Sequence, residues 1–120
     1  MRVRRCAVGR RERAQPVSAS PTQRTLAELR KRGYPLVQVV ERWNPFAHVR
    51  QDLFGIIDVV AVGPDIVGVQ ATSASNVSAR ITKITESAAL PVLRKAGIRV
   101  LVHGWRKVGS RWQLREVELS

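Results

Sequence analysis

The sequence DVVAVGPDIVGVQATS, residues 58–73, decides the predicted fold of this chain. Two apolar runs rich in β-branched residues flank three turn-forming residues, 63–65, which is the pattern of a β-hairpin. With residues 63–65 as the loop, Val62 is expected to lie opposite Ile66. The stretch therefore predicts two adjacent antiparallel strands with a fixed register.

Polar residues gather at the end of this hairpin that lies away from the turn. Counting outward along the two strands places Asp58 opposite Gln70, and Thr72 shares the face of Gln70 because side chains alternate. A carboxylate among valines and isoleucines is costly to bury unless a partner offsets its desolvation. A divalent cation held by oxygens of Asp58 and Gln70 is one such partner. The alternatives are that Asp58 caps a neighbouring loop or forms an ion pair with Arg50 or Arg80, and the spacing alone leaves all of these open.

Regular elements are expected on both sides of the hairpin. Ser20 and Gln23 form a capping-box pattern that starts a helix, and Gly33 ends it. Apolar residues at helical spacing follow the hairpin. The order α-β-β-β-α-β-β predicts an α/β fold, with a mixed β-sheet flanked by helices. The expected ranges are a helix near 20–33, strands at 35–43, 52–62 and 66–73, a helix at 76–90, a short helix at 91–97, and strands at 98–105 and 111–119.

The charge balance predicts a polyanionic partner. The 120 residues include 21 Lys and Arg but 9 Asp and Glu, a formal net charge of +12. Such an excess is usually relieved by a polyanion, and nucleic acid is the first candidate. Residues 1–20 hold six arginines without an apolar pattern and are expected to form a flexible basic arm, with one domain at 21–120. A solvated basic surface without a dedicated partner is the simpler alternative.

Other classes of protein are disfavoured by the composition. The single cysteine, Cys6, cannot close an internal disulfide, and with only His48 and His103 no zinc-type cluster is expected. No apolar run is long enough to span a membrane and no signal peptide is evident, so a soluble cytoplasmic protein is expected. His103, on an apolar strand, is expected to be structural, and the tryptophans are expected to complete the core.

The run RQDLFGIIDVVAVGPDIVGVQATSASNVSARITKI, residues 50–84, resembles the PD-(D/E)xK nuclease superfamily. The resemblance is to small Holliday-junction-resolvase-like and virus-type nuclease proteins of phages, and it extends over residues 22–119. It implies a restriction-endonuclease-like core and Mg²⁺- or Mn²⁺-dependent hydrolysis of DNA, including branched DNA. It also implies a homodimer that acts in the cytoplasm of a bacterial or phage-infected cell.

The resemblance also suggests roles for individual residues. Members of the superfamily carry a glutamate on a helix, an aspartate on a hairpin, and then an acidic residue and a lysine two positions apart. Asp58 matches the aspartate, Gln70 the acidic position, Thr72 the lysine position, and Glu28 the helix glutamate. Gln70 keeps an oxygen but lacks the charge, and Thr72 lacks the lysine's charge. Relatives that move the lysine to the following helix make Lys83, or Arg80, the candidate replacement.

Further residues complete the predicted site. Asp52, on the same face as Asp58 if a regular strand extends that far, would be a second acidic ligand or a solvated residue. Glu28 has an alternative as a surface residue paired with Arg24 or Arg32. A decayed nuclease fold that only binds nucleic acid, and a basic RNA-binding structural protein, are the alternatives to an enzyme. The expected nucleic-acid contacts are basic residues on the helix or near the last turn: Arg80, Lys83, Arg106, Lys107 and Arg111.

Overall fold

The computed structural model describes residues 19–119. The predicted flexible arm lies outside the described residues except for its last two positions, Ala19 and Ser20. The elements, in chain order, are α2 (Pro21–Lys31), β1 (Leu36–Val39), β2 (Arg42–Asn44), β3 (Val49–Gln51), β4 (Val59–Val62), β5 (Ile66–Ser73), η1 (Ala74–Asn76), α3 (Val77–Thr85), α4 (Ala89–Lys95), β6 (Arg99–Val108) and β7 (Arg111–Glu118).

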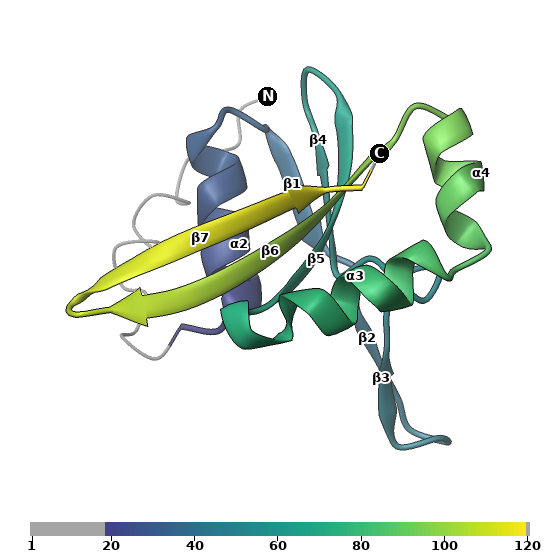
Figure 1. Cartoon of the computed structure of the whole chain (residues 1–120). Coiled ribbons are helices and arrows are strands. Elements are labelled where there is room, and N and C mark those ends of the chain that lie inside the picture. Colours follow the sequence, from purple (N-terminus) through teal and green to yellow (C-terminus); the bar gives the residue numbers. More distant parts are fainter. Residues whose placement is uncertain (1–18, 120) are drawn as a thin grey trace.

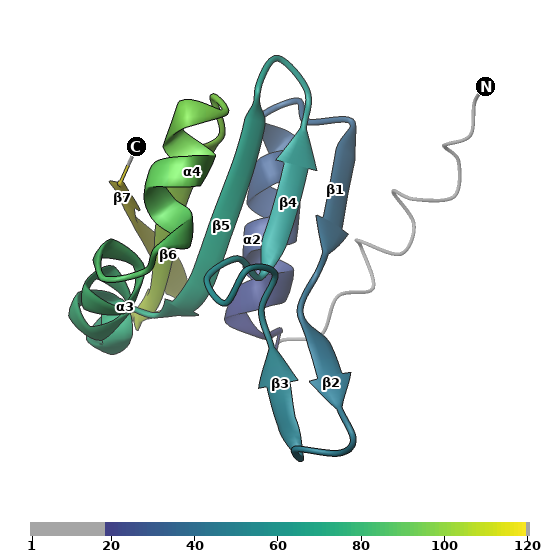
Figure 2. The same cartoon turned by 90° about the vertical axis from the view of Figure 1, so that its right-hand side faces the viewer.

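The predicted mixed sheet is present. Its five strands are arranged in the order β1-β4-β5-β6-β7, and β2 and β3 form a separate two-stranded sheet. Strands β5 and β6 are parallel, whereas the other three pairings of the large sheet are antiparallel. Helix α2 covers one face of the sheet, and α3 and α4 cover the other (Figure 2). The chain is therefore an α/β protein with helices on both faces.

The register of the central hairpin is the predicted one. Val62 pairs with Ile66, and the pairing continues to Val59 opposite Val69. The backbone N–H of Gly63 donates to the carbonyl of Asp65 at 3.0 Å and closes the loop. Because this register is confirmed, the residues before β4 lie beside the middle of β5.

Helix α2 begins and ends where the sequence predicts. The backbone N–H of Gln23 donates to Ser20 Oγ at 3.2 Å, and the N–H of Ser20 donates to Gln23 Oε1 at 3.2 Å. Leu29 is fully buried in the core between α2 and the sheet. Gly33, with φ of +97°, reverses the chain in a conformation that favours glycine.

The helical segment after β5 is divided differently from the prediction. Helix α3 ends at Thr85, and α4 begins at Ala89, two residues before the expected start at Pro91. Proline is tolerated there because it occupies the first turn, where backbone N–H groups have no partner within the helix. Asn76 is the N-cap of α3, but its side chain donates to Ser73 Oγ at 3.1 Å instead of capping the helix.

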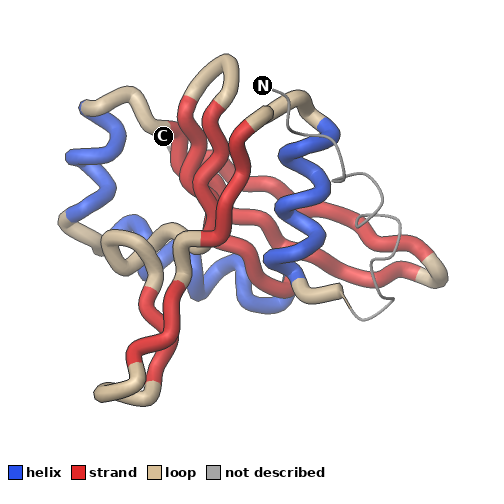
Figure 3. The backbone as a smooth tube through the Cα atoms, turned by 180° about the vertical axis from the view of Figure 1, so that it is seen from behind, coloured by secondary structure: helices blue, strands red, loops and turns tan. Residues whose placement is uncertain are grey.

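The single strand predicted at 35–43 is wrong, because the chain forms two strands there. Strand β2 leaves the sheet and pairs with β3 in a hairpin that projects from the body of the molecule (Figures 1 and 3). Asn44 turns the chain, since its Oδ1 accepts from the N–H groups of Phe46 at 2.9 Å and Ala47 at 3.1 Å. Trp43 lies on this hairpin and is 55% exposed, so it does not complete the core as expected.

The strand predicted at 52–62 begins later, at Val59. Before it, Leu53 and Ile57 exchange backbone hydrogen bonds of 2.8 and 3.0 Å around a tight turn. Gly55, with φ of +79°, occupies the left-handed region in this turn. Burial of Ile56 and Ile57 holds the turn against the core below α3 and α4.

Strand β6 extends past its predicted end at residue 105 to Val108, whereas β7 ends at Glu118, one residue before its predicted end; together the two strands form an arm (Figure 1). Arg106 and Lys107 lie within β6, not in the turn, which is made at Gly109 with φ of +63°. Gly104 on β6 permits a close approach, because a Cβ atom there would lie 2.2 Å from Val77 Cγ2. Within residues 19–119, no helix has the length and apolar character needed to cross a membrane.

Candidate metal centre

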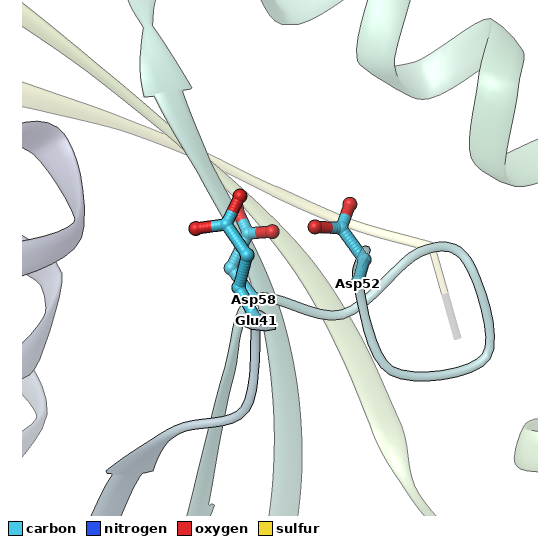
Figure 4. A group of neighbouring side chains, drawn as sticks. All are labelled: Glu41, Asp52 and Asp58. Atoms are coloured by element: carbon cyan, nitrogen blue, oxygen red, sulfur yellow. The ribbon is translucent and has the colours of Figure 1, made fainter. Parts of the chain in front are cut away.

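Three carboxylates meet where the projecting hairpin joins the sheet. Oxygens of Glu41, Asp52 and Asp58 lie within 4.8 Å of one another and face a shared space (Figure 4). Glu41 precedes β2, Asp52 follows β3, and Asp58 precedes β4. Asp58 is 5% exposed, and the other two are half-buried. This cluster could hold a metal ion.

Asp58 is fixed by the backbone of β5. Its N–H donates to the carbonyl of Val69 at 2.9 Å, and its Oδ2 accepts from the N–H of Ala71 at 3.0 Å. Burial, followed by a hydrogen bond with Asp52, raises the pKa of Asp58 to about 8, although the Ala71 N–H acts in the opposite direction. Near neutral pH the metal-free pair therefore holds a proton on Asp58.

Asp52 carries the negative charge of this pair. Burial disfavours its ionised form, but hydrogen bonds from Asp58, Gln70 and Lys83 outweigh burial and lower its pKa. Lys83 Nζ, on α3, lies 3.2 Å from Asp52 Oδ2. The helix lysine suggested by the resemblance is therefore beside the carboxylate cluster.

Gln70 connects the carboxylates to α3. Its Nε2 donates to Ile56 O at 2.8 Å, Asp52 Oδ2 at 3.1 Å and Asp58 Oδ1 at 3.3 Å. Its Oε1 accepts from Arg80 at 2.8 Å. The partners determine the amide orientation, because a guanidinium can only donate, whereas the Ile56 carbonyl and the ionised Asp52 carboxylate can only accept. This orientation differs from the expected one, in which Oε1 faced the cation.

The convergence of Asp58 and Gln70 is confirmed, but within residues 19–119 neither Glu28 nor Thr72 forms a hydrogen bond with them. Glu28 accepts from Arg32 Nε at 2.9 Å. The structure therefore shows the alternative interpretation of Glu28, a surface residue paired with an arginine. Helix α2 covers the opposite face of the sheet from α3 (Figure 2). Thr72 is buried on β5, and within the described chain no hydrogen bond joins it to either Asp58 or Gln70.

Glu41 was missed in the sequence because it lies inside a predicted strand. Strand β1 ends at Val39, and the N–H groups of Val40 and Glu41 donate to the Asp58 carbonyl at 2.8 and 3.3 Å. Both contacts tie the start of the projecting hairpin to Asp58. Asp52 does reach the site as suggested, but through the tight turn at Leu53–Ile57 and not along a regular strand.

The predicted nucleic-acid contacts fall on different surfaces. Arg80 and Lys83 lie on α3 beside the carboxylates. Arg106 and Arg111 share the arm's α3 face, as the pairs Arg106–Gln113 and Val108–Arg111 show. Lys107 pairs with Trp112 and faces the opposite side.

His103 belongs to a separate buried network on the α2 side. Trp105 Nε1 donates to Thr25 Oγ1 at 3.0 Å, which leaves the Thr25 hydroxyl to donate to His103 Nδ1 at 3.1 Å. His103 Nε2 then donates to Glu116 Oε2 at 2.8 Å, so the imidazole is the neutral tautomer with its proton on Nε2. The expectation of a structural histidine is confirmed.

Comparisons with protein-family models, curated proteins and solved structures give no match to this chain.

Proposed function

We propose that the protein is a metal-dependent DNA endonuclease that hydrolyses phosphodiester bonds, with branched, Holliday-junction-type DNA as a substrate. The observation that supports this most is the meeting of three carboxylates with Lys83 and Arg80 of α3. This arrangement is similar to the superfamily site in which a lysine moves to the helix. A homodimer in the cytoplasm of a bacterial or phage-infected cell belongs to the same proposal.

The carboxylates suit a small hard cation. Mg²⁺ and Mn²⁺ prefer oxygen ligands, and Mg²⁺ commonly takes one or two carboxylates and completes its shell with water and substrate phosphate. Asp52 and Asp58 are the best-placed ligands, with Glu41 as a third. Asp52 and Glu41 supply the negative charge that is missing at Gln70. A bound cation would polarise the scissile phosphodiester and lower the pKa of an attacking water.

The remaining residues hold this arrangement in place and supply positive charge. The Ala71 N–H orients Asp58, and the Gln70 amide holds Asp52 and Asp58 beside the carbonyl of Ile56. Lys83 is 45% exposed, so its ammonium group can contact both Asp52 and a phosphate that approaches the cluster. The catalytic roles of Thr72 and Glu28 stay predictions, since both lie outside this group of contacts.

A nucleic-acid-binding module with a decayed nuclease site is the second candidate. Gln70 Nε2 donates to both Asp52 and Asp58, and Lys83 pairs with Asp52. These contacts offset the buried negative charge without a metal ion. A decayed site, which binds no metal, would need such an offset. The same basic surface would then bind DNA without cutting it.

Cleavage assays separate the two candidates. Labelled linear, branched and single-stranded DNA would be incubated with the wild type, Asp58→Asn and the control Glu86→Gln, with and without Mg²⁺ or Mn²⁺. Glu86 is an exposed acid at the end of α3, so its substitution removes one charge outside the cluster. Metal-dependent cutting lost only in Asp58→Asn supports the nuclease. Binding without cutting under every metal supports the module.

A further inference from the structure

A basic pocket lies at the base of the β6–β7 arm, apart from the carboxylate cluster. It has a volume of about 440 Å³ and is lined by Ala74, Ser75, Gly104, Arg106, Gln113 and Arg115. Gly104 contributes to its shape, because the missing side chain lets η1 and the start of α3 lie directly on β6. The lining carries two guanidinium groups, one amide and one hydroxyl, and no carboxylate.

The two arginines are placed to act on one ligand. Gly104 pairs with Arg115 and Arg106 pairs with Gln113, so Arg106 and Arg115 are diagonal neighbours on one face of the arm. Such neighbours have Cα atoms about 7–8 Å apart, close enough for two long side chains to reach the same group. Arg111 lies on the same face farther along the arm, opposite Val108.

The part of the chain that the structure describes does not balance the charge of these two arginines. Within residues 19–119, neither Arg106 nor Arg115 forms an ion pair or a side-chain hydrogen bond. Arg32 and Arg99 behave differently: Arg32 binds Glu28 and Glu116, and Arg99 binds Asp65 and Glu118. Two exposed, unbalanced guanidinium groups in one pocket therefore favour an anion from outside.

We infer that this pocket binds a phosphate group of a nucleic acid through Arg106 and Arg115, with Gln113 and Ser75 as additional donors. Guanidinium groups match phosphate oxygens in charge and in the geometry of paired N–H donors. The inference rests on the nucleic-acid-binding part of the proposed function and not on cleavage. A phosphate within the chain and a terminal 5′-phosphate share this chemistry, and the experiment distinguishes them.

Binding would be measured by fluorescence anisotropy with EDTA present, so that metal-dependent cleavage does not contribute. The probes are 3′-labelled single-stranded and duplex oligonucleotides, each with a 5′-hydroxyl or a 5′-phosphate. The test variant is Arg106→Gln/Arg115→Gln, and the control is Lys31→Gln/Lys95→Gln, which removes two exposed cations from other surfaces. Circular dichroism verifies that both variants fold.

The test variant is expected to bind at least about tenfold more weakly than the control. The slope of log K against log salt concentration should fall by about 2, roughly one for each lost phosphate contact. An equal loss with both 5′ ends assigns the pocket to a phosphate within the chain, and a loss confined to 5′-phosphorylated probes assigns it to the terminus. Equal binding by test and control variants, or no binding of any probe by the wild type, overturns the inference. If the test variant loses binding and the wild type does not cleave DNA with Mg²⁺, the inference is retained and the nuclease is rejected.

Discussion

Asp58 and Asp52 share a proton across the join between the sheet and the projecting hairpin. Burial and the contact with Asp52 raise the pKa of Asp58 to about 8, whereas hydrogen bonds from Asp58, Gln70 and Lys83 lower the pKa of Asp52 despite its burial. The two carboxylates therefore carry one negative charge near neutral pH. A divalent cation would have to displace the proton, and this links metal binding to pH.

Metal affinity is expected to increase with pH up to about 8. Below that value each pH unit should raise Mn²⁺ affinity by up to about tenfold, because one proton competes with the ion. Isothermal titration calorimetry in buffers of different ionisation enthalpy should show close to one proton released per ion at pH 7. Binding without proton release would contradict the shared proton.

Asp58 should stabilise the metal-free protein less as the solution becomes more alkaline. The native pKa of Asp58 lies above its ordinary value of 3.8, so the native state holds a proton that the unfolded state has lost. The contribution of Asp58 to the free energy of unfolding should therefore fall as pH rises from about 4 to 8. Urea denaturation of the wild type and Asp58→Asn would measure this. The variant, which cannot ionise there, should show a smaller fall over the same pH range.

Lys83→Gln should reduce cleavage much more than it reduces DNA affinity. It removes the cation 3.2 Å from Asp52 Oδ2, at the position where phosphate charge would develop. Loss of one such electrostatic contact typically lowers kcat by about 10²–10³-fold. Lys95→Gln, a lysine substitution on α4, is the matched control. An equal effect of both variants would show that Lys83 acts only through general charge.

Gln70→Glu should make the protein more dependent on metal. The substitution replaces an amide that donates to three oxygens with a carboxylate, so the metal-free protein should lose about 1–3 kcal/mol of stability. Arg80 remains available to pair with the new carboxylate. Mg²⁺ should then raise Tm more in the variant than in the wild type, by differential scanning fluorimetry. A smaller shift in the variant would place the cation away from position 70.

The His103 network should stabilise the protein mainly above pH 6.5. Burial disfavours the imidazolium and lowers the pKa of His103, so the unfolded state takes up a proton first as pH falls. Stability is then lost as pH falls below 6.5 towards the native pKa. Thr25→Ala leaves Trp105 Nε1 and His103 Nδ1 without their partner and should cost about 1–3 kcal/mol, whereas Thr25→Ser should cost less. The free energy of unfolding would be measured by denaturation at pH 7.5. Equal losses in Thr25→Ala and Thr25→Ser would contradict this role of the hydroxyl.

Local patterns with a definite geometry could be predicted from the sequence. The loop at 63–65 fixed the hairpin register, and the register brought Asp58 to Gln70. The capping box and Gly33 defined α2 because each acts on a single backbone position. Lys83 was suggested by the resemblance and not by a local pattern; it lies beside Asp52, and its catalytic role stays a prediction.

Features that depend on contacts between distant segments were missed. Glu41 joins the cluster because β2 leaves the sheet, and the apolar run at 35–43 conceals that break. Asp52 was expected on a regular strand, but a tight turn with Phe54 and Gly55 at positive φ places it. The orientation of Gln70 depends on Arg80, ten residues away on α3, and no strand pattern encodes that partner.

The most direct test is metal-dependent cleavage of branched DNA by the wild type, Asp58→Asn and Glu86→Gln at one protein concentration. We predict that the wild type and Glu86→Gln cut the junction with Mg²⁺ or Mn²⁺ and not with EDTA, and that Asp58→Asn is at least about 10²-fold slower. Equal cutting by all three proteins would contradict the carboxylate cluster as the catalytic centre. No cutting of any DNA by the wild type under either metal would contradict the nuclease itself.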